Sequence, residues 1–119
     1  RDPRRRRELE RIAAVCDELA AGPPTSFHAA LQLVQFTRIF GASGCIGRFD
    51  QWMGCFYERD VSTGVLTRPE AQELLEYLWL KFNEIVLLRS SSSARYFAGF
   101  PIGFNIALGG KNPDGSDSA

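Results

Sequence analysis

The sequence predicts a mostly helical chain with one short strand, which forms a part of a larger fold rather than a complete domain. Four stretches have the spacing or capping signals of helices, whereas only residues 104–108 have the pattern of a strand. A lone strand needs partners to form a sheet, and we expect this chain to supply none. The second helical stretch is apolar nearly all round, so it requires burial that a small domain seldom provides.

The composition is that of an ordinary globular protein. The chain has 119 residues, of which 45% are apolar and 24% charged, and these values argue against disorder, collagen and a disulfide scaffold. Fourteen basic and fourteen acidic residues cancel, which argues against a dedicated nucleic-acid binder. No apolar run is long enough for a membrane span. The chain starts at Arg1 without a methionine and ends in a polar string, so we expect a piece of a longer protein.

The first two helices are predicted from the spacing of apolar residues and from residues that typically end or cap helices. Residues 4–21 carry an apolar stripe, with apolar residues three and four positions apart on an otherwise charged helix. Gly22-Pro23-Pro24 ends this helix, because proline cannot continue it. Thr25 or Ser26 then caps a second helix that runs to about Phe40.

The second half of the chain contains two more predicted helices. Residues 48–57 are rich in aromatic side chains and predict a short helix, and residues 60–64 predict a turn. The sequence Thr67-Arg68-Pro69-Glu70 is a capping box that opens a helix reaching about Leu88. Residues 89–99 are expected to form a serine-rich loop.

The cysteines and the single histidine indicate structural roles. Cys16, Cys45 and Cys55 contain no C-x-x-C pair, which favours a reducing compartment and makes the cytosol the expected location. Their separations from His28 match no common zinc site, so we expect buried, inert thiols and no metal. His28 has no evident acidic or thiol partner in sequence, and a structural role is favoured over a catalytic one.

Other sequence features that could indicate binding or catalysis are better explained without a functional site. Arg4 to Arg7 could bind phosphate or nucleic acid, but glutamates follow directly and a solvated helix start is favoured. The nucleotide-binding fingerprints are absent. Ser90 to Ser93 lack the G-x-S-x-G context of a hydrolase nucleophile.

Asp50 is the most informative charged residue. It follows the small-residue run 41–47 and stands among aromatic residues, which would place a carboxylate at the edge of an apolar pocket. An ion pair with Arg48 or a helix cap explains it equally well. The residues alone leave both interpretations open.

Several segments together resemble one known protein family. Each segment is a weak match by itself, but their order and spacing along the chain are specific. They are Thr25–Gln32, Gly47–Gln51, Asp60 with Gly64–Thr67, Leu78–Glu84, and Phe104–Gly110 with Asp114–Asp117. From Pro23 to Ala119 the chain resembles the pyruvate formate-lyase domain of glycyl radical enzymes. It looks closest to the branch that contains glycerol, choline and hydroxyproline eliminases and arylacetate decarboxylases.

The resemblance implies that residues 1–119 are a central fragment of a ten-stranded α/β barrel. In this family an activating enzyme with an iron–sulfur cluster uses S-adenosylmethionine to place a radical on a C-terminal glycine. A loop cysteine then abstracts hydrogen from a small substrate, and dehydration, another elimination or decarboxylation follows. This chain has neither the Gly-Cys-Val-Glu cysteine loop nor the Arg-Val-x-Gly-Tyr glycine loop. The resemblance therefore implies a radical lyase, homodimeric at full length, that binds no cofactor directly. Its glycyl radical lies outside this segment, so the segment alone is expected to be inactive.

The resemblance also suggests substrate-binding residues. Diol-dehydrating relatives read roughly Gly-His-Ser-Ile-Ser-Leu before the Gly-Arg-x-Asp-Gln motif, whereas residues 41–46 read Gly-Ala-Ser-Gly-Cys-Ile. Ser43 keeps a hydroxyl for a substrate oxygen and Cys45 would line the pocket, so a polyol such as glycerol is not expected. Asp50 matches the family acid and is expected to contact the substrate. Phe104 lies in a segment that approaches the pocket, although core packing explains it equally well.

An alternative from another functional class is a non-catalytic helical interaction module derived from the same fold. Such a module would fold stably by itself and bind a protein partner.

Overall fold

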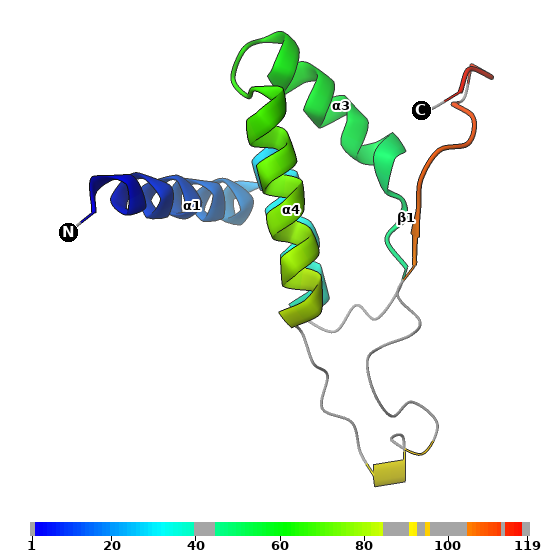
Figure 1. Ribbon diagram of the computed structural model, residues 1–119, viewed down its shortest axis with the longest axis horizontal. Helices are drawn as coiled ribbons and strands as arrows, with labels where there is room; N and C mark the ends of the chain where they lie inside the picture. The colour runs from blue at the N-terminus through cyan, green and yellow to red at the C-terminus, as the bar shows by residue number, and fades with distance from the viewer. Residues whose placement is uncertain are drawn as a thin grey trace.

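The computed structural model describes residues 2–39, 45–84, 91, 92, 95, 105–112 and 114–117. Helices account for most of this part of the chain (Figure 1). In chain order the elements are α1 (Pro3–Ala21), α2 (Phe27–Ile39), β1 (Gly47–Arg48), α3 (Phe49–Ser62), α4 (Arg68–Glu84) and β2 (Ile106–Ala107).

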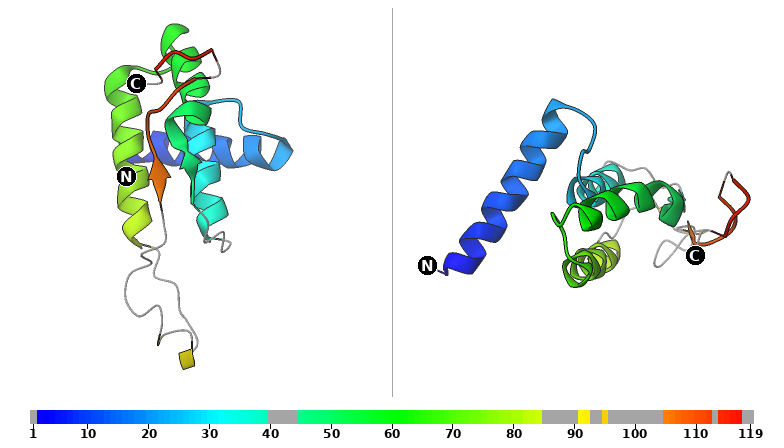
Figure 2. Two further views of the ribbon diagram at one scale, coloured as in Figure 1. Left: turned by 90° about the vertical axis from the view of Figure 1, so that its right-hand side faces the viewer. Right: turned by 90° about the horizontal axis from the view of Figure 1, so that it is seen from above.

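Helix α2 lies at the centre of the arrangement. It packs against α1, α3 and α4, and α1 extends away from the other three helices towards the N-terminus (Figure 2). Helices α3 and α4 follow one another through the turn at residues 63–67 and both rest on α2. The position of each helix is therefore set mainly by its contact with α2.

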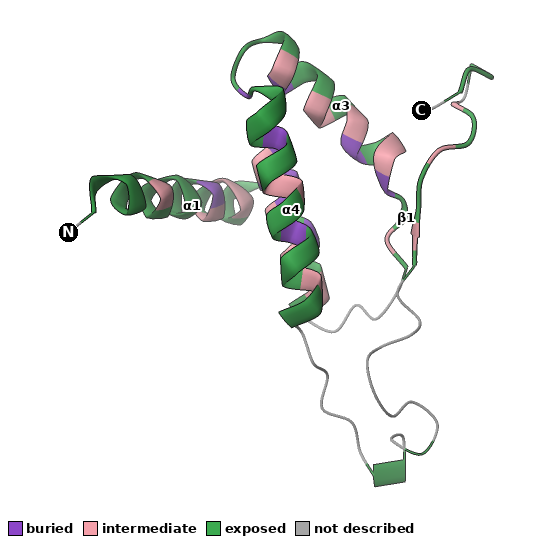
Figure 3. Cartoon of the chain, in the orientation of Figure 1, coloured by how far each residue is buried: buried purple, intermediate pink, exposed green. Residues whose placement is uncertain are grey.

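The core is formed where the inner faces of α2, α3 and α4 meet (Figure 3). Phe27 and Met53 each keep only 2% of their surface exposed. Burial of a side chain of this size stabilises a fold by about 1.5–3 kcal/mol. The buried residues of this cluster are Phe27, Ala30, Leu31, Val34, Phe49, Met53, Leu66, Ala71 and Leu78.

A buried carboxylate ties the start of α2 to the end of α3. Asp60, 6% exposed, accepts a hydrogen bond at Oδ2 from the backbone N–H of Phe27 at 2.7 Å. Its Oδ1 accepts one from Arg59 Nε at 3.0 Å, and Arg59 also donates to the carbonyl of Thr25. Because the first N–H groups of a helix have no partner within it, Asp60 acts as a cap supplied from another helix.

The predicted capping box at the start of α4 is confirmed. Glu70 Oε2 accepts hydrogen bonds from the Thr67 N–H at 2.9 Å and the Thr67 hydroxyl at 2.7 Å. These two bonds stabilise the ionised carboxylate and hold the pKa of Glu70 below its ordinary value. The sequence placed this helix start correctly because the capping residues are only three positions apart.

The predicted end of α3 is wrong. The sequence predicted a helix over 48–57 and a turn over 60–64, whereas the helix continues to Ser62. The longer helix carries Asp60 to the start of α2, and Gly64 (φ 72°) then allows the chain to turn into α4. The predicted extension of α4 to Leu88 and most of the serine-rich loop lie outside the described residues.

The expectation that the strand has no partner within this chain is also wrong. Strand β2 pairs in parallel with β1, with Gly47 opposite Ile106 and Arg48 opposite Ala107. The Ile46 N–H donates to the Asn105 carbonyl at 3.1 Å and extends the contact. Strand β1 gave no periodic signal because it consists of only a glycine and an arginine. The described chain is thus a mostly helical α/β arrangement with a small parallel sheet.

The all-round burial expected of the second helix holds for only part of α2. Phe27, Ala30 and Leu31 in its first turns are buried, but Leu33 and Ile39 keep 38% and 53% of their surface exposed. The neighbouring helices therefore bury mainly the first turns of α2 and one side of the rest.

Replacing Asp60 tests the cap between α3 and α2. We expect Asp60→Ala to lower the free energy of unfolding by about 1–3 kcal/mol, because it leaves the Phe27 N–H without its acceptor. Urea denaturation of the full-length protein, followed by circular dichroism, measures this change. Asp60→Asn retains an acceptor oxygen and should cost less, and Glu58→Ala on the exposed side of α3 is the matched control. Equal losses for Asp60→Ala and Glu58→Ala would contradict the cap.

Candidate functional site

The parallel strand pair brings together two segments that lie about 60 residues apart in the sequence. Strand β1 leads directly into α3, and β2 leads into residues 108–111. In parallel sheets the carboxyl ends of neighbouring strands meet at one edge, which is where α/β proteins commonly bind ligands. The Gly47–Gln51 segment therefore lies against the chain that follows β2.

Asp50 joins these two strand ends. It is half-buried in the first turn of α3, where the helix dipole favours a carboxylate. Its Oδ2 accepts a hydrogen bond from the Gly109 N–H at 2.6 Å. Asp50 is thus held against the backbone beyond β2 and also lies on the wall of a cavity.

Two neighbouring side chains bind one carbonyl of the same segment. Arg48 Nη2 and Gln51 Nε2 donate to the Lys111 carbonyl at 3.3 Å and 3.1 Å. Gly110 lies between the two bonded backbone groups with φ at 97°, a conformation that favours glycine. A Cβ at this position would lie 2.5 Å from Arg48 Nη2.

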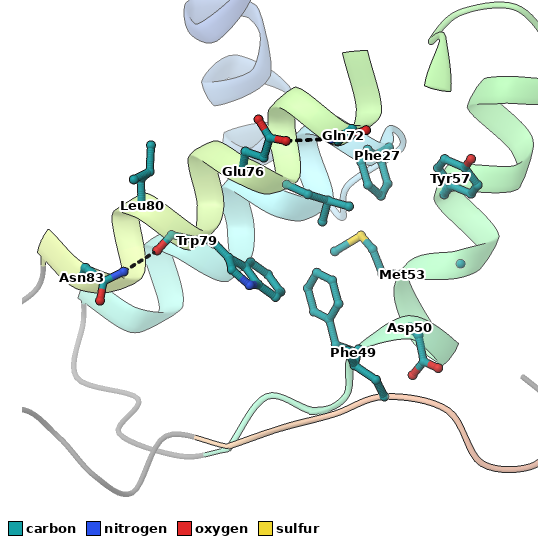
Figure 4. A pocket seen from close by; sticks show the side chains of 13 residues that line it. Phe27, Phe49, Asp50, Met53, Tyr57, Gln72, Glu76, Trp79, Leu80 and Asn83 are labelled. Atoms are coloured by element: carbon teal, nitrogen blue, oxygen red, sulfur yellow. Dashed lines mark hydrogen bonds between the residues drawn. The ribbon is translucent and has the colours of Figure 1, made fainter. Parts of the chain in front are cut away.

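A cavity of about 780 Å³ opens between α3 and α4, with Phe27 of α2 in its wall (Figure 4). Its wall is mainly apolar and aromatic. The Phe49 and Trp79 rings pack edge to face, with 5.7 Å between the ring centroids. Asp50 lies at one end of the cavity, while Gln72 and Glu76 bind each other at 2.8 Å on α4. The lining residues are Phe27, Phe49, Asp50, Met53, Gly54, Tyr57, Gln72, Leu75, Glu76, Trp79, Leu80, Asn83 and Leu108.

The predicted substrate-binding residues lie at two places along the strand pair. Cys45 precedes β1, and its Sγ accepts a hydrogen bond from Asn105 Nδ2 at 3.9 Å. Asp50 follows β1 and lies at the opposite end of the pair. Ser43 and Phe104 lie outside the described residues. The structure therefore brings Cys45 to Asn105 and Asp50 to Gly109, but it does not bring Cys45 and Asp50 together.

The expectation of buried cysteines is wrong for two of the three. Cys45 and Cys55 are exposed and Cys16 is half-buried, all as reduced thiols. Cys55 lies on the outer side of α3, away from the face that carries Phe49 and Met53 into the core. Within the ranges that the structure describes, no three histidine, cysteine or acidic side chains gather as metal ligands would.

The basic start of the chain is a solvated helix, as predicted. Arg4 and Arg5 both pair with Glu8, at 3.2 and 3.1 Å, and Arg6 pairs with Glu10 at 2.8 Å. The arginines and Glu10 are largely exposed, and Glu8 is half-buried. In the described parts of the chain, no helix combines the length and apolar character that crossing a bilayer requires.

Sequence reasoning missed Gln51 and Asn105 as members of this region. Both stand inside the segments that carry the family resemblance, but their bonding partners are 60 residues away in the chain. The position of Gln51 next to Asp50 was the only hint in the sequence, and it does not identify the Lys111 carbonyl as the partner of Gln51.

Comparisons with known proteins agree with this geometry. A family model described as pyruvate formate lyase-like matches residues 1–119. The chain belongs to the pyruvate formate lyase-like family. Trans-4-hydroxy-L-proline dehydratase of Clostridioides difficile is 40% identical over 98% of this chain, and isethionate sulfite-lyase of Nitratidesulfovibrio vulgaris is 35% identical over 98%.

A solved structure gives the corresponding comparison of folds within this family. It concerns 1,2-propanediol dehydration in Roseburia inulinivorans and matches 98% of this chain with a TM-score of 0.85 and 39% identity. The chain spans only 15% of that structure and 15 to 16% of the two curated relatives. The helices and the strand pair thus correspond to a limited part of much longer family members.

The environment of His28 leads to a prediction about pH. Burial and the positive charge of Arg11 lower the pKa of His28 below its ordinary value of 6.5, and Glu18 opposes this shift. The unfolded chain therefore binds a proton at His28 more readily than the folded chain, and stability falls as the pH drops below about 6.5. We expect His28→Gln to remove this part of the decline.

Urea denaturation of the full-length protein at about pH 5.5 and pH 7.5 measures the effect, since these values lie on either side of the ordinary histidine pKa. The comparison is the difference in the free energy of unfolding between the two pH values. An identical difference in the variant and the unsubstituted protein would contradict the assignment.

Proposed function

We propose that this chain is part of a glycyl radical lyase that eliminates a small group from a small organic substrate. The observation that carries the proposal is the similarity at 35–40% identity, over 98% of the chain, to a dehydratase and a sulfite-lyase. Both names describe loss of a leaving group, water in one case and sulfite in the other. Decarboxylation is the other reaction that the family resemblance suggests.

The proposed radical chemistry belongs to parts of the protein other than these 119 residues. A glycyl radical supplies hydrogen-atom abstraction when it has been installed by an S-adenosylmethionine-dependent activating enzyme. Neither loop motif that would carry this chemistry occurs in the sequence, and none of its cysteines stands in the Gly-Cys-Val-Glu context. Cys45 and Cys55 therefore have no role as the hydrogen-abstracting thiol in this proposal.

The proposed architecture is a ten-stranded barrel to which this chain contributes as a partial domain. Support comes from apolar surface around the cavity, where Trp79 and Leu80 keep 42% and 61% of their area exposed. A soluble fold covers large apolar faces with other segments. In this proposal another part of the same polypeptide covers the exposed apolar side of α4 that carries Trp79 and Leu80.

The proposed substrate region lies along the β1–β2 pair. Ser43, Cys45 and Phe104 are proposed to contact the substrate, and of these Cys45 lies directly before β1. Asp50 is proposed to belong to the same region from the carboxyl ends, on the strength of its place in the cavity wall. Because residues 42 and 45 are alanine and cysteine, the region offers few hydroxyl partners, and a substrate other than a polyol is favoured.

The proposed partners are a small-molecule substrate, the activating enzyme and a second copy of the full-length protein. A cytosolic location agrees with three reduced thiols. The proposal includes no nucleic acid and no membrane among the partners.

Spectroscopy of the full-length protein tests the radical assignment. After anaerobic incubation with an activating enzyme, S-adenosylmethionine and a reductant, we expect the doublet of a glycyl radical by electron paramagnetic resonance. Brief exposure to oxygen should abolish the doublet, and protein incubated without S-adenosylmethionine is the control. Absence of the doublet under all activating conditions would sink the proposal.

A non-catalytic interaction module remains the second candidate, because the open apolar cavity could accept a protein partner. The melting behaviour of residues 1–119 separates the two proposals. A partial barrel should melt broadly or aggregate, since its apolar faces lack their cover. A sharp, reversible and cooperative transition by circular dichroism would favour the module.

A further inference from the structure

We infer that Arg48, Asp50 and Gln51 form a clamp that fixes the backbone of residues 109–111, and that Asp50 and Gln51 act in it as positioning residues. The clamp itself follows from the contacts. Its consequence for turnover rests on the proposed function.

Each member of the clamp binds a backbone group rather than another side chain. Asp50 Oδ2 accepts from the Gly109 N–H at 2.6 Å, and Gln51 Nε2 donates to the Lys111 carbonyl at 3.1 Å. Arg48 Nη2 donates to the same carbonyl at 3.3 Å. One acceptor and two donors, from the end of β1 and the first turn of α3, thus bind one N–H and one C=O group of a three-residue segment.

The segment needs such partners because the strand ladder has ended. Strand β2 stops at Ala107, and the backbone groups of residues 108–110 are no longer paired with β1, while Lys111 forms an isolated antiparallel bridge with Asp117. Backbone groups in partly buried surroundings require a hydrogen-bonding partner, and Gly109 is half-buried. The side chains at the start of α3 supply these partners.

Gly110 makes the close approach possible. With φ at 97° it turns the chain between the two clamped groups, and a Cβ would lie 2.5 Å from Arg48 Nη2. A larger residue here would strain the backbone and displace the guanidinium group from the Lys111 carbonyl.

The clamp lies next to the cavity. Leu108 is a lining residue, and it stands between the end of β2 and the clamped Gly109. Fixing residues 109–111 therefore fixes one wall of the cavity beside Asp50. In the proposed lyase, this places the clamp where it sets the shape of the substrate region without contact to the reacting atoms.

Hydrogen–deuterium exchange of the full-length protein tests the clamp without any turnover. We expect Asp50→Ala to increase the exchange of the peptide covering residues 105–112 by about fivefold to tenfold, because one backbone hydrogen bond is lost. Asp50→Asn keeps an acceptor oxygen and should stay within about twofold of the unsubstituted protein, since the role needs an acceptor and not a charge. Gln51→Ala provides a second variant in case Asp50→Ala does not fold, and Glu58→Ala on α3 is the control.

Two results would overturn the clamp. One is unchanged exchange of residues 105–112 in both Asp50→Ala and Gln51→Ala. The other is an Asp50→Asn variant that exchanges as fast as Asp50→Ala, which would show that the charge is required.

Kinetics of the activated enzyme test the positioning role. We expect Gln51→Ala to raise KM by about threefold to tenfold and to lower kcat less, as loss of a shaped binding wall should do. An unchanged KM would overturn the positioning role. Failure to form the radical would instead contradict the proposed function, and the exchange result would still decide the clamp.

Discussion

The hydrogen bond from the Phe27 N–H to Asp60 is the interaction on which the rest of the arrangement depends. It fixes the first turn of α2 against the last turn of α3, at a point where the helix has no internal partner for its N–H groups. With α2 fixed, its buried face can receive α4 as well, and α1 packs on it from the other direction. Helices α3 and α4 then touch α2 on different sides, which leaves the cavity open between them.

The acidic residues of this chain illustrate how carboxylates stabilise backbone ends. Glu18, Asp50, Asp60 and Glu70 each accept a hydrogen bond from a backbone N–H, at a loop, a strand end or a helix start. A side-chain oxygen supplies an acceptor at places where regular structure leaves an N–H group without a partner. An acidic side chain among aromatic residues therefore has an architectural explanation that must be weighed before a catalytic one.

The sequence could predict those features whose causes are local. The start of α4 was predictable because Thr67 and Glu70 are three residues apart, and the stripe and glycine–proline stop of α1 are equally local. The extent of α3 and the existence of β1 were not predictable, because they depend on Asp60 reaching Phe27 and Gly47 reaching Ile106. At the candidate site, Asp50 could be placed beside an apolar pocket from its neighbours, but its partner Gly109 is 59 residues away.

Two-residue strands are too short to define their own register, since a parallel pair gains stability from many ladder bonds. A shift of one residue would turn every side chain of β2 to the opposite face. The bonds from Asp50 to Gly109 and from Gln51 to Lys111 permit only one register, because each requires a particular backbone group at a particular position. The same register places Asn105 beside Cys45 at the other end of the pair. The contacts at the carboxyl ends of the strands thus determine which side chains meet at their amino ends.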